Sequence, residues 1–389
     1  MFSLLKNLPE GKNWTLDELN ERQVQILIPA IIFISICIVV GTVGNALVLY
    51  VNIFVIKLRN SPHRHFITFL GLSDITICMI FDTFLLMVLT HPYTLTNKLI
   101  CKYFRAFNFV SNYISALTLV AIALDRYRRI CRAHENQFSV RNIKCIFAIV
   151  IFFSFIISIP SFILYGKTTI KTGFPNITGS NCFIDDKFVL SWFPHVHIIF
   201  LYVTFIITAA LISVFYILVW RKLIQHNQPM EIGADVTEAK VLSCAKDTND
   251  IDMASAKIIA DTHHNIDTVI DNAGIPETCI NTAKNIYTCT TNTLKEKTIR
   301  VSKLFFVVTA FYVFSNVPFY TLTTIAFLKE NFVYDLDNTS AMFFQLFWRS
   351  YAINSMVNPL IYGIMDTRFR MACRKLVLEK LRILTHFNE

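Results

Sequence analysis

Charged residues are scarce in this sequence. They make up 16% of its 389 residues, whereas hydrophobic residues make up 54%. Because a soluble domain usually carries roughly 25% charged residues, this balance excludes an ordinary water-soluble globule and favours a membrane protein. The formal net charge is +9. We attribute this excess to Lys and Arg residues at the cytoplasmic face of the membrane, rather than to a nucleic-acid-binding site.

Signatures of other protein classes are also missing. The stretch Met1–Leu8 has no long apolar run and no basic start before a cleavage site, so we expect no secretory signal peptide there. The ten cysteines include no Cys-x-x-Cys pair and no Cys/His cluster with metal-ligand spacing, which argues against a zinc or disulfide-dense scaffold. No catalytic constellation occurs either, so the protein is not expected to be an enzyme.

Seven apolar runs reach the length of about 20 residues that a helix needs to cross a hydrocarbon core. They are Ile26–Ile56, Phe66–Thr90, Phe104–Leu124, Ile143–Tyr165, Trp192–Trp220, Val301–Leu328 and Ala341–Met365. Lys and Arg concentrate in the segments on the side opposite the N-terminus, which predicts an N-terminus outside the cell. Three Asn-x-Ser/Thr sequons, at Asn13, Asn176 and Asn338, all fall in predicted outer segments, where they could be glycosylated.

The remaining segments complete the predicted organisation. Residues 1–25 form an outer N-terminus, residues 26–365 the seven-helix domain and residues 366–389 a cytoplasmic tail. The polar stretch 223–296 is predicted to be a disordered cytoplasmic loop, with a small folded insert as the alternative. In the tail, Phe369, Ala372 and Leu376 recur at helical spacing among basic residues. This pattern predicts an amphipathic helix that lies on the inner surface of the membrane, in contact with its lipids. The expected fold is an all-α membrane protein, a seven-transmembrane helix bundle with a short amphipathic C-terminal helix.

Polar residues inside apolar helices are costly and therefore indicate function. Here they form an ordered series: Gly44-Asn45 in the first helix, Leu72-Ser73-Asp74 in the second, Asp125-Arg126-Tyr127 at the inner end of the third, Pro318 in the sixth, and Asn358-Pro359-Leu360-Ile361-Tyr362 in the seventh. This series resembles that of the rhodopsin-like (class A) G-protein-coupled receptors. The resemblance implies a plasma-membrane receptor that binds an extracellular ligand and activates a heterotrimeric G protein, with arrestin and a receptor kinase as further partners.

The resemblance also implies roles for individual residues. Cys101 and Cys182 correspond to the family's disulfide, with two unpaired thiols as the alternative. The aspartate that holds a sodium ion in similar receptors corresponds to Asp74, and its other oxygen ligands correspond to Ser115, Asn354, Ser355 and Asn358. The alternative is a protonated Asp74 in a polar network. No other cofactor is implied.

The G-protein switch of the family is matched at the inner ends of the helices. The corresponding residues are Asp125, Arg126, Tyr127, Tyr216, Asn358, Pro359 and Tyr362. In the family this arginine is held until activation and then helps to form the G-protein cavity. A purely structural ion pair between Asp125 and Arg126 is the alternative.

Several positions depart from the family pattern. Asn316 stands where the helix-six motif Cys-Trp-x-Pro has tryptophan, Thr208 replaces the usual helix-five proline, and Tyr312 replaces the usual helix-six phenylalanine. The fourth run, Ile143–Tyr165, has no tryptophan. We therefore expect the transmission from ligand to cytoplasm to differ from that of typical relatives.

Two further absences narrow the ligand class. The seventh run contains no lysine, and Ala352 occupies the position that binds retinal in opsins, so a light receptor is not expected. Asn108 stands where amine receptors have a carboxylate, so an amine ligand is not expected either. The pocket candidates that remain are Asp82, Arg105, Asn108, Asn112, Asn316, Trp348 and Arg349. Asp82 could instead pair internally with Arg105 or Arg349, and Trp348 could simply pack.

A long outer loop, roughly Gly166 to Ser191, carries charges of both signs, which favours a peptide ligand such as a neuropeptide or peptide hormone. A receptor for a non-peptide small molecule and an orphan receptor are the alternatives. A transporter is a distant one, because the internal repeats typical of transporters are missing.

Overall fold

The structure, a computed structural model, describes residues 14–56, 62–172, 174, 177–225, 277–329 and 332–386. The chain divides into two compact units. The larger unit comprises Met1–Arg126, Gln137–Tyr216 and Leu304–Glu389, and the smaller comprises Tyr127–Asn136 and Ile217–Lys303. The site residues discussed below lie in the larger unit, except Tyr127.

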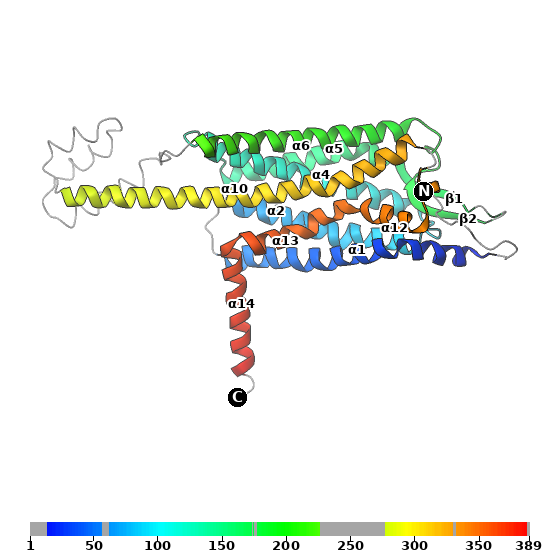
Figure 1. The fold of residues 1–389 in the computed structure, drawn as a ribbon, viewed down its shortest axis with the longest axis horizontal. Coiled ribbons are helices and arrows are strands. Elements are labelled where there is room, and N and C mark those ends of the chain that lie inside the picture. The colour runs from blue at the N-terminus through cyan, green and yellow to red at the C-terminus, as the bar shows by residue number, and fades with distance from the viewer. Residues whose placement is uncertain are drawn as a thin grey trace. The chain divides into compact units, whose positions relative to one another are not determined.

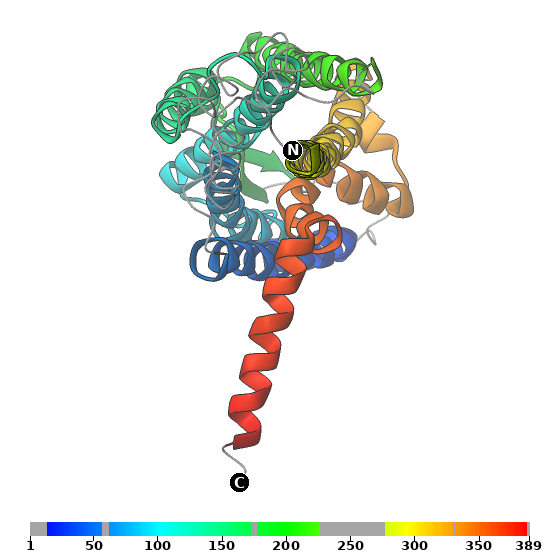
Figure 2. The same ribbon diagram turned by 90° about the vertical axis from the view of Figure 1, so that its left-hand side faces the viewer.

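Helices dominate the described residues (Figure 1). In chain order the elements are α1 (Leu16–Tyr50), η1 (Val51–Val55), α2 (Pro62–Thr76), η2 (Ile77–Asp82), α3 (Thr83–Thr90), α4 (Lys98–Cys131), α5 (Val140–Leu164), β1 (Tyr165–Lys171), β2 (Thr178–Ile184), α6 (Phe193–Gln225), α10 (Glu277–Leu328), α11 (Phe332–Asp335), α12 (Asn338–Phe347), η3 (Ser350–Ala352), α13 (Ile353–Met365) and α14 (Thr367–His386). In the larger unit, α1 lies side by side with α2, α3, α12 and α13, as Figure 2 shows along the helix axes.

Within the described ranges, six helices are long and apolar enough to cross a membrane, by length and composition. They match the first six predicted runs. The seventh run is divided into α12, η3 and α13. The break has a local cause, because the Gln345 carbonyl accepts a hydrogen bond from the Arg349 guanidinium (2.5 Å). The backbone N–H of Arg349 bonds to the Leu346 carbonyl instead (3.1 Å), so the chain tightens into a short turn.

The structure differs from the predicted boundaries at two places. The first helix begins at Leu16 rather than Ile26, because Thr15 and Glu18 form a reciprocal capping box that closes its N-terminus. The loop predicted for residues 223–296 is shortened at both ends, since α6 reaches Gln225 and α10 begins at Glu277. Extending an existing helix costs far less than nucleating one, so a spanning helix continues readily into adjacent polar sequence. Residues 226–276 lie outside the described residues.

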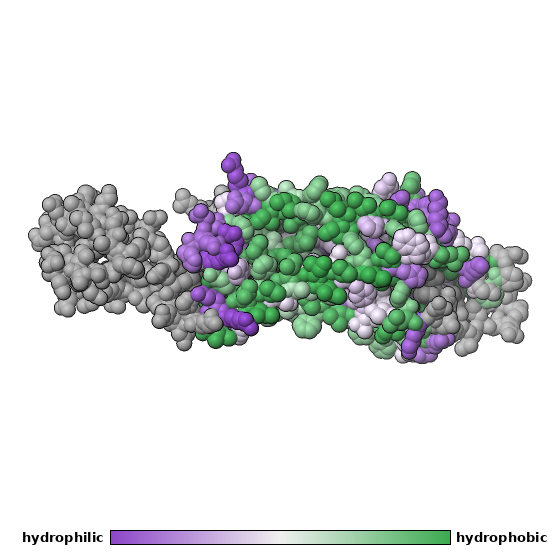
Figure 3. Space-filling model, turned by 90° about the horizontal axis from the view of Figure 1, so that it is seen from above, coloured by the Kyte–Doolittle hydropathy of each residue, from purple (hydrophilic) through white to green (hydrophobic). Residues whose placement is uncertain are grey.

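Apolar side chains cover the outer surface of the larger unit. Phe152 and Ile163 of α5 are 61% and 48% exposed, and Ile206 of α6 is 59% exposed. Figure 3 shows a green apolar band along the helices with hydrophilic residues at its two ends. Such a large exposed apolar surface suits a hydrocarbon environment rather than water.

A β-hairpin lies at one end of the larger unit. Strands β1 and β2 pair antiparallel, with Lys167 opposite Cys182. Cys182 is bonded to Cys101 near the start of α4, with a Cα–Cα distance of 5.0 Å. The predicted disulfide is therefore present, and the long outer loop is an ordered hairpin fixed to α4.

The amphipathic helix predicted after the seventh run is α14, which runs crosswise to the other helices of the larger unit (Figure 1). Its residues Phe369 and Ala372 are buried, whereas Met371 and Leu378 are exposed.

In the smaller unit, Arg132 donates hydrogen bonds to Glu135 (3.0 Å) and to the Tyr127 hydroxyl (3.3 Å). The Cys131 thiol contacts the Leu218 carbonyl at 3.6 Å.

Close packing between α1 and α13 provides a direct test of the bundle. A Cβ atom added at Gly44 would lie 2.8 Å from two ring carbons of Pro359, whereas one added at Gly363 meets nothing within 4 Å. We expect Gly44→Ala to lower the free energy of unfolding by about 1–3 kcal/mol through overpacking. Gly363→Ala should instead leave it unchanged or raise it by about 0.5–1 kcal/mol, because alanine favours the helix. Thermal melts of the purified variants measure both effects, and equal melting temperatures for the two would contradict this packing.

Candidate functional site

A buried polar network surrounds Asp74 of α2, which is fully buried. Its Oδ2 accepts a hydrogen bond from Asn358 Nδ2 (2.7 Å) and its Oδ1 one from Ser115 Oγ (3.3 Å). Ser355 also forms a side-chain hydrogen bond with Asp74. Asn45 connects α1 to the network, because its Nδ2 donates to the Ser355 carbonyl at 2.8 Å. Residues from four spanning segments thus meet at one carboxylate.

The chemistry of this network fits a small hard cation. Asp74 brings a carboxyl group into a fully buried place. The Oδ1 atoms of Asn354 and Asn358 are buried and have no hydrogen-bond partner in the part of the chain that the structure describes. Carboxylate, hydroxyl and amide oxygens are the donors that hard cations prefer. The described residues hold no group of three or more His, Cys, Asp or Glu side chains that could bind a transition metal.

A second buried charge lies farther along the helices, at Arg126 of α4. Its guanidinium is 3% exposed and forms an ion pair with the neighbouring Asp125. The ring of Phe305 on α10 covers it, with the guanidinium carbon 5.7 Å from the ring centroid. Tyr216 of α6 is buried beside Arg126, and its hydroxyl has no hydrogen-bond partner within the described residues. The Arg126 guanidinium is thus paired with Asp125 and covered by the Phe305 ring.

Tyr362, the last residue of the predicted switch, is buried in α13. Its hydroxyl has no hydrogen-bond partner within the described ranges. Pro359 stands one turn earlier in the same helix and faces Gly44 of α1. Tyr127 belongs to the smaller unit, where its ring lies under Arg132.

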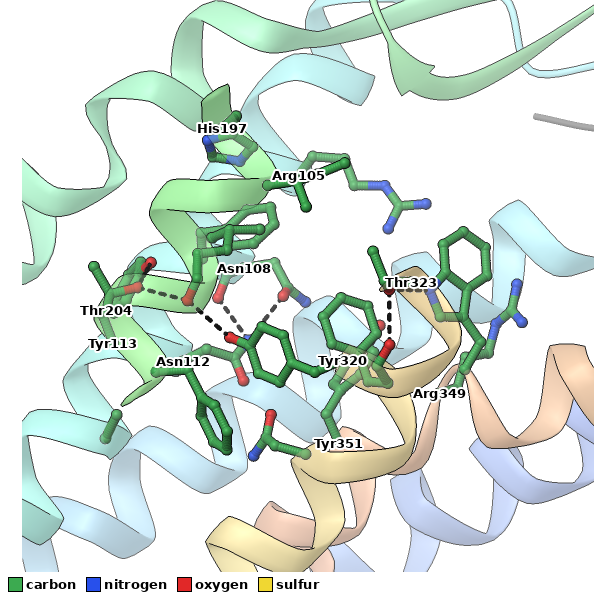
Figure 4. A pocket seen from close by; sticks show the side chains of 18 of the residues that line it. Arg105, Asn108, Asn112, Tyr113, His197, Thr204, Tyr320, Thr323, Arg349 and Tyr351 are labelled. Atoms are coloured by element: carbon green, nitrogen blue, oxygen red, sulfur yellow. Dashed lines mark hydrogen bonds between the residues drawn. The ribbon is translucent and has the colours of Figure 1, made fainter. Parts of the chain in front are cut away.

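Between the helices at the hairpin end lies a cavity of about 200 Å³ (Figure 4). Six of the seven predicted pocket residues line it: Arg105, Asn108, Asn112, Asn316, Trp348 and Arg349. Hydrogen bonds fix several of its walls. Asn112 Nδ2 donates to Asn108 Oδ1 (2.8 Å), and the Trp348 indole N–H donates to Thr323 Oγ1 (3.0 Å).

Asp82, the seventh predicted pocket residue, does not line the cavity. It is 1% exposed at the end of η2, and its two carboxylate oxygens have no hydrogen-bond partner in the described part of the chain. The wide π-turn of η2 changes which side chains face the cavity, a shift that helical periodicity does not predict. The alternative of an ion pair with Arg105 or Arg349 is wrong as well, since neither guanidinium comes within 4.0 Å of Asp82.

Sequence reasoning missed several residues in or beside the cavity because it searched mainly for charged and amide side chains. Tyr113 and Thr204 join α4 to α6 through their hydroxyls (3.0 Å). The Tyr202 hydroxyl bonds to the Tyr320 carbonyl and to Thr324, which joins α6 to α10. Aromatic hydroxyls are common in spanning helices, so only the combination of tyrosine and threonine on two neighbouring helices could have indicated these contacts.

The departures from the family pattern contact one another. The side chains of Tyr312 on α10 and Thr208 on α6 lie close enough to interact. Asn316 Nδ2 donates to the Tyr312 carbonyl one turn earlier (2.8 Å). Both Thr208 and Tyr312 line the cavity floor. The altered positions therefore form a polar contact between two helices where relatives have apolar side chains.

An ion pair fixes the hairpin beside the cavity. Lys98 Nζ lies 2.7 Å from Asp185 Oδ2, and Asp185 Oδ1 accepts the backbone N–H of Lys187 (3.2 Å). Burial alone would raise the pKa of Asp185, but these hydrogen bonds and the two lysine charges hold it below its usual value. The Asp185 carboxylate therefore stays ionised at neutral pH.

Comparisons with known proteins identify the family. Residues 44–362 match the model of the 7 transmembrane receptor (rhodopsin family). The chain therefore belongs to the rhodopsin family of seven-transmembrane receptors, which are receptors rather than enzymes. The predicted all-α bundle and multi-pass membrane topology are confirmed.

Relatives agree with this assignment. The chain is 27% identical over 230 residues to the neuropeptide S receptor of Mus musculus, a match that covers 59% of this chain and 60% of that protein. It is 31% identical over 150 residues to nematocin receptor 2 of Caenorhabditis elegans, covering 37% of each. The matches thus span less than two thirds of these relatives. The crystal structure of squid rhodopsin shares the fold, with a TM-score of 0.61 at 18% identity over 93% of this chain and 87% of that one.

The contact between Thr208 and Tyr312 is testable with a double-mutant cycle. If a hydrogen bond between these side chains joins α6 to α10, Thr208→Val and Tyr312→Phe should each destabilise the receptor, and the double variant should lose less than their sum. We expect a coupling of about 0.5–1.5 kcal/mol. Thermal unfolding of the four purified proteins measures it. Purely additive losses would show that the two side chains do not interact.

Proposed function

We propose that this chain is a G-protein-coupled receptor for an extracellular peptide, such as a neuropeptide. The observation that carries the proposal is the family match over residues 44–362, which includes both the outer cavity and the covered Arg126. Two relatives, a neuropeptide S receptor and a nematocin receptor, support a peptide ligand. The cavity is lined by aromatic and polar side chains beneath a fixed hairpin, which suits the end of a peptide.

The proposed mechanism begins with the cover over Arg126. In the structure Phe305 and Asp125 hold the guanidinium, so a G protein cannot reach it until α10 moves. Pro318 lies within α10, and its missing N–H allows the helix to bend there. Ligand contacts at Tyr320 and Thr323, which follow Pro318, and at Asn316, which precedes it, would favour the moved position of α10. The residues that switch would then be those predicted from the sequence: Asp125, Arg126, Tyr127, Tyr216, Asn358, Pro359 and Tyr362.

The proposed location is the plasma membrane with the N-terminus outside. The basic residues that favour this orientation include Arg368, Arg370 and Arg374 of α14, which would rest on lipid headgroups. Asn338 is exposed at the first position of α12 and is accessible for glycosylation. Asn13 and Asn176 lie outside the described residues. Arrestin and a receptor kinase would act at the same inner side, as in similar receptors.

Sodium is the proposed ligand of the Asp74 network when the receptor rests. Asp74, Ser115, Asn354, Ser355 and Asn358 would hold it, and two amide oxygens among them are buried with no hydrogen-bond partner in the described residues. The ion would supply the positive charge that compensates Asp74 in a place without water. The residues themselves hold α2, α4 and α13 together through hydrogen bonds to Asp74.

Because the Phe305 ring covers Arg126, removing that ring should raise the basal signalling activity of the receptor. Phe305→Ala should uncover the guanidinium and raise basal GTP exchange several-fold in membranes that contain receptor and G proteins. Phe314→Ala is the matched control, because this ring on the same helix is 73% exposed and should leave exchange unchanged. Arg126→Gln added to Phe305→Ala should abolish the gain. If neither the wild type with peptide extracts nor Phe305→Ala produces exchange with any G protein, the proposed signalling is wrong.

The sodium proposal predicts an ion-specific stabilisation. Replacing choline chloride with sodium chloride at equal ionic strength should raise the melting temperature of the wild-type receptor by several degrees. Asp74→Asn should remove this difference, because the neutral amide no longer attracts the cation. Ser73→Ala, which changes the adjacent residue of α2, serves as the control. An equal response of wild type and Asp74→Asn to sodium would exclude Asp74 as the binding residue.

A further inference from the structure

The outer cavity contains two arginines and no acidic side chain among its lining residues. Arg105 comes from α4, and Arg349 comes from the break between α12 and η3. Within the described ranges, no carboxylate lies within 4.0 Å of either guanidinium. The cavity therefore carries positive charge that the described part of the protein does not compensate directly.

Neutral acceptors orient both guanidinium groups. Arg105 Nη2 donates to the Cys182 carbonyl of the hairpin at 3.2 Å. Arg349 Nη1 donates to the Gln345 carbonyl (2.5 Å) and to Gln345 Oε1 (2.7 Å). The guanidinium carbon of Arg349 lies 5.7 Å from the ring centroid of Trp348. These contacts fix the positions of the charges without neutralising them.

Each arginine also retains an unused donor. The Nε atoms of Arg105 and Arg349 are buried, and neither has a hydrogen-bond partner within the described part of the chain. Arg349 is only 4% exposed, so water cannot hydrate it freely. Figure 4 shows the Arg105 guanidinium reaching across the cavity toward the wall that carries Thr323 and Arg349. Both arginines therefore line the same cavity, and each has an Nε donor without a partner among the described residues.

Energetics favour an anionic occupant. Arginine stays protonated in proteins, so a buried guanidinium cannot lose its charge to escape the cost of burial. The charges of Arg105 and Arg349 oppose each other. A carboxylate placed between them would satisfy both and form charge-assisted hydrogen bonds, which are stronger than neutral ones.

We propose that the ligand of this receptor presents a carboxylate that binds between Arg105 and Arg349. The inference rests on the proposed peptide-receptor function and specifies the chemistry of its ligand. The carboxylate is either the free C-terminus of a peptide or an Asp or Glu side chain near its end. Aromatic walls formed by Phe183, Trp348 and Tyr351 accept an aromatic residue next to the carboxylate.

Binding of matched short peptides to the purified full-length receptor tests this directly. Acetyl-Phe-Phe with a free carboxylate is compared with its C-terminal amide, and acetyl-Glu-Phe-amide is compared with acetyl-Gln-Phe-amide. Concentration-dependent shifts of the melting temperature report affinity without any G protein. At least one acid should bind about ten- to a hundredfold more tightly than its neutral partner. A preference in the first pair assigns the C-terminus, and one in the second pair assigns a side chain.

Variants locate the carboxylate. Arg105→Gln and Arg349→Gln should each reduce the preference for the acid to near unity, whereas Lys102→Gln, on the same helix but outside the cavity lining, should retain it. Arg349→Lys should restore part of the preference by restoring the charge. If Arg349→Gln fails to melt cooperatively, Arg105→Gln and Arg349→Lys decide the outcome.

Equal affinities for acids and amides, or acid binding that survives both substitutions, would overturn the proposal, as would the failure of both acids to bind. Failure of the proposed function looks different. There the acid would bind and depend on both arginines, while GTP exchange remained absent under all conditions.

Discussion

The structure depends on one constraint, which is that a polar group inside an apolar bundle must find its partner within the protein. In hydrocarbon no water replaces a missing hydrogen bond, and each unsatisfied group costs several kcal/mol. Thr118 and Thr323 meet the constraint locally, because their hydroxyls donate to carbonyls one turn earlier (2.6 and 2.7 Å). Asn45 meets it across helices through the Ser355 carbonyl. Polar atoms without a partner among the described residues lie beside Asp74, at Asn354 and Asn358, and on the two cavity arginines, and these two places are assigned to ligands.

The same constraint connects the outer cavity to the covered arginine. Ser350 in the break of the seventh segment donates its hydroxyl to the Ser315 carbonyl of α10 (2.6 Å). Asn316, the next residue of α10, lines the cavity, and Tyr312 one turn earlier lies beside Thr208 of α6. Farther along α10, Phe305 covers Arg126. A change at the cavity that moves α10 must therefore break or re-form polar contacts along this helix. Because such contacts are either made or broken, two discrete positions of α10 are favoured over a gradual deformation.

The sequence predicted the parts of the fold that follow from hydropathy and from embedded charge. Apolar runs of spanning length located the helices, and the ordered polar series located Asp74, Arg126 and Asn358, because few chance sequences place such costly residues at those depths. The break at Arg349 could not be predicted, since it depends on a guanidinium taking the Gln345 carbonyl. The position of Asp82 was wrong for a similar reason, because the π-turn of η2 leaves no signal in apolar periodicity. Contacts such as Tyr312 with Thr208 need the relative rotation of two helices, which the sequence alone does not specify.

The central claim is that occupation of the outer cavity moves α10 away from Arg126. A pair of spin labels tests it most directly, one on Cys145, an exposed free cysteine of α5, and one on a Phe306→Cys variant of α10. The other reactive cysteines are replaced by serine. With a peptide shown to bind and nucleotide-free G protein present, pulsed electron paramagnetic resonance should reveal a second, longer distance between the labels. A distance distribution that stays unchanged while the peptide is bound would contradict the account.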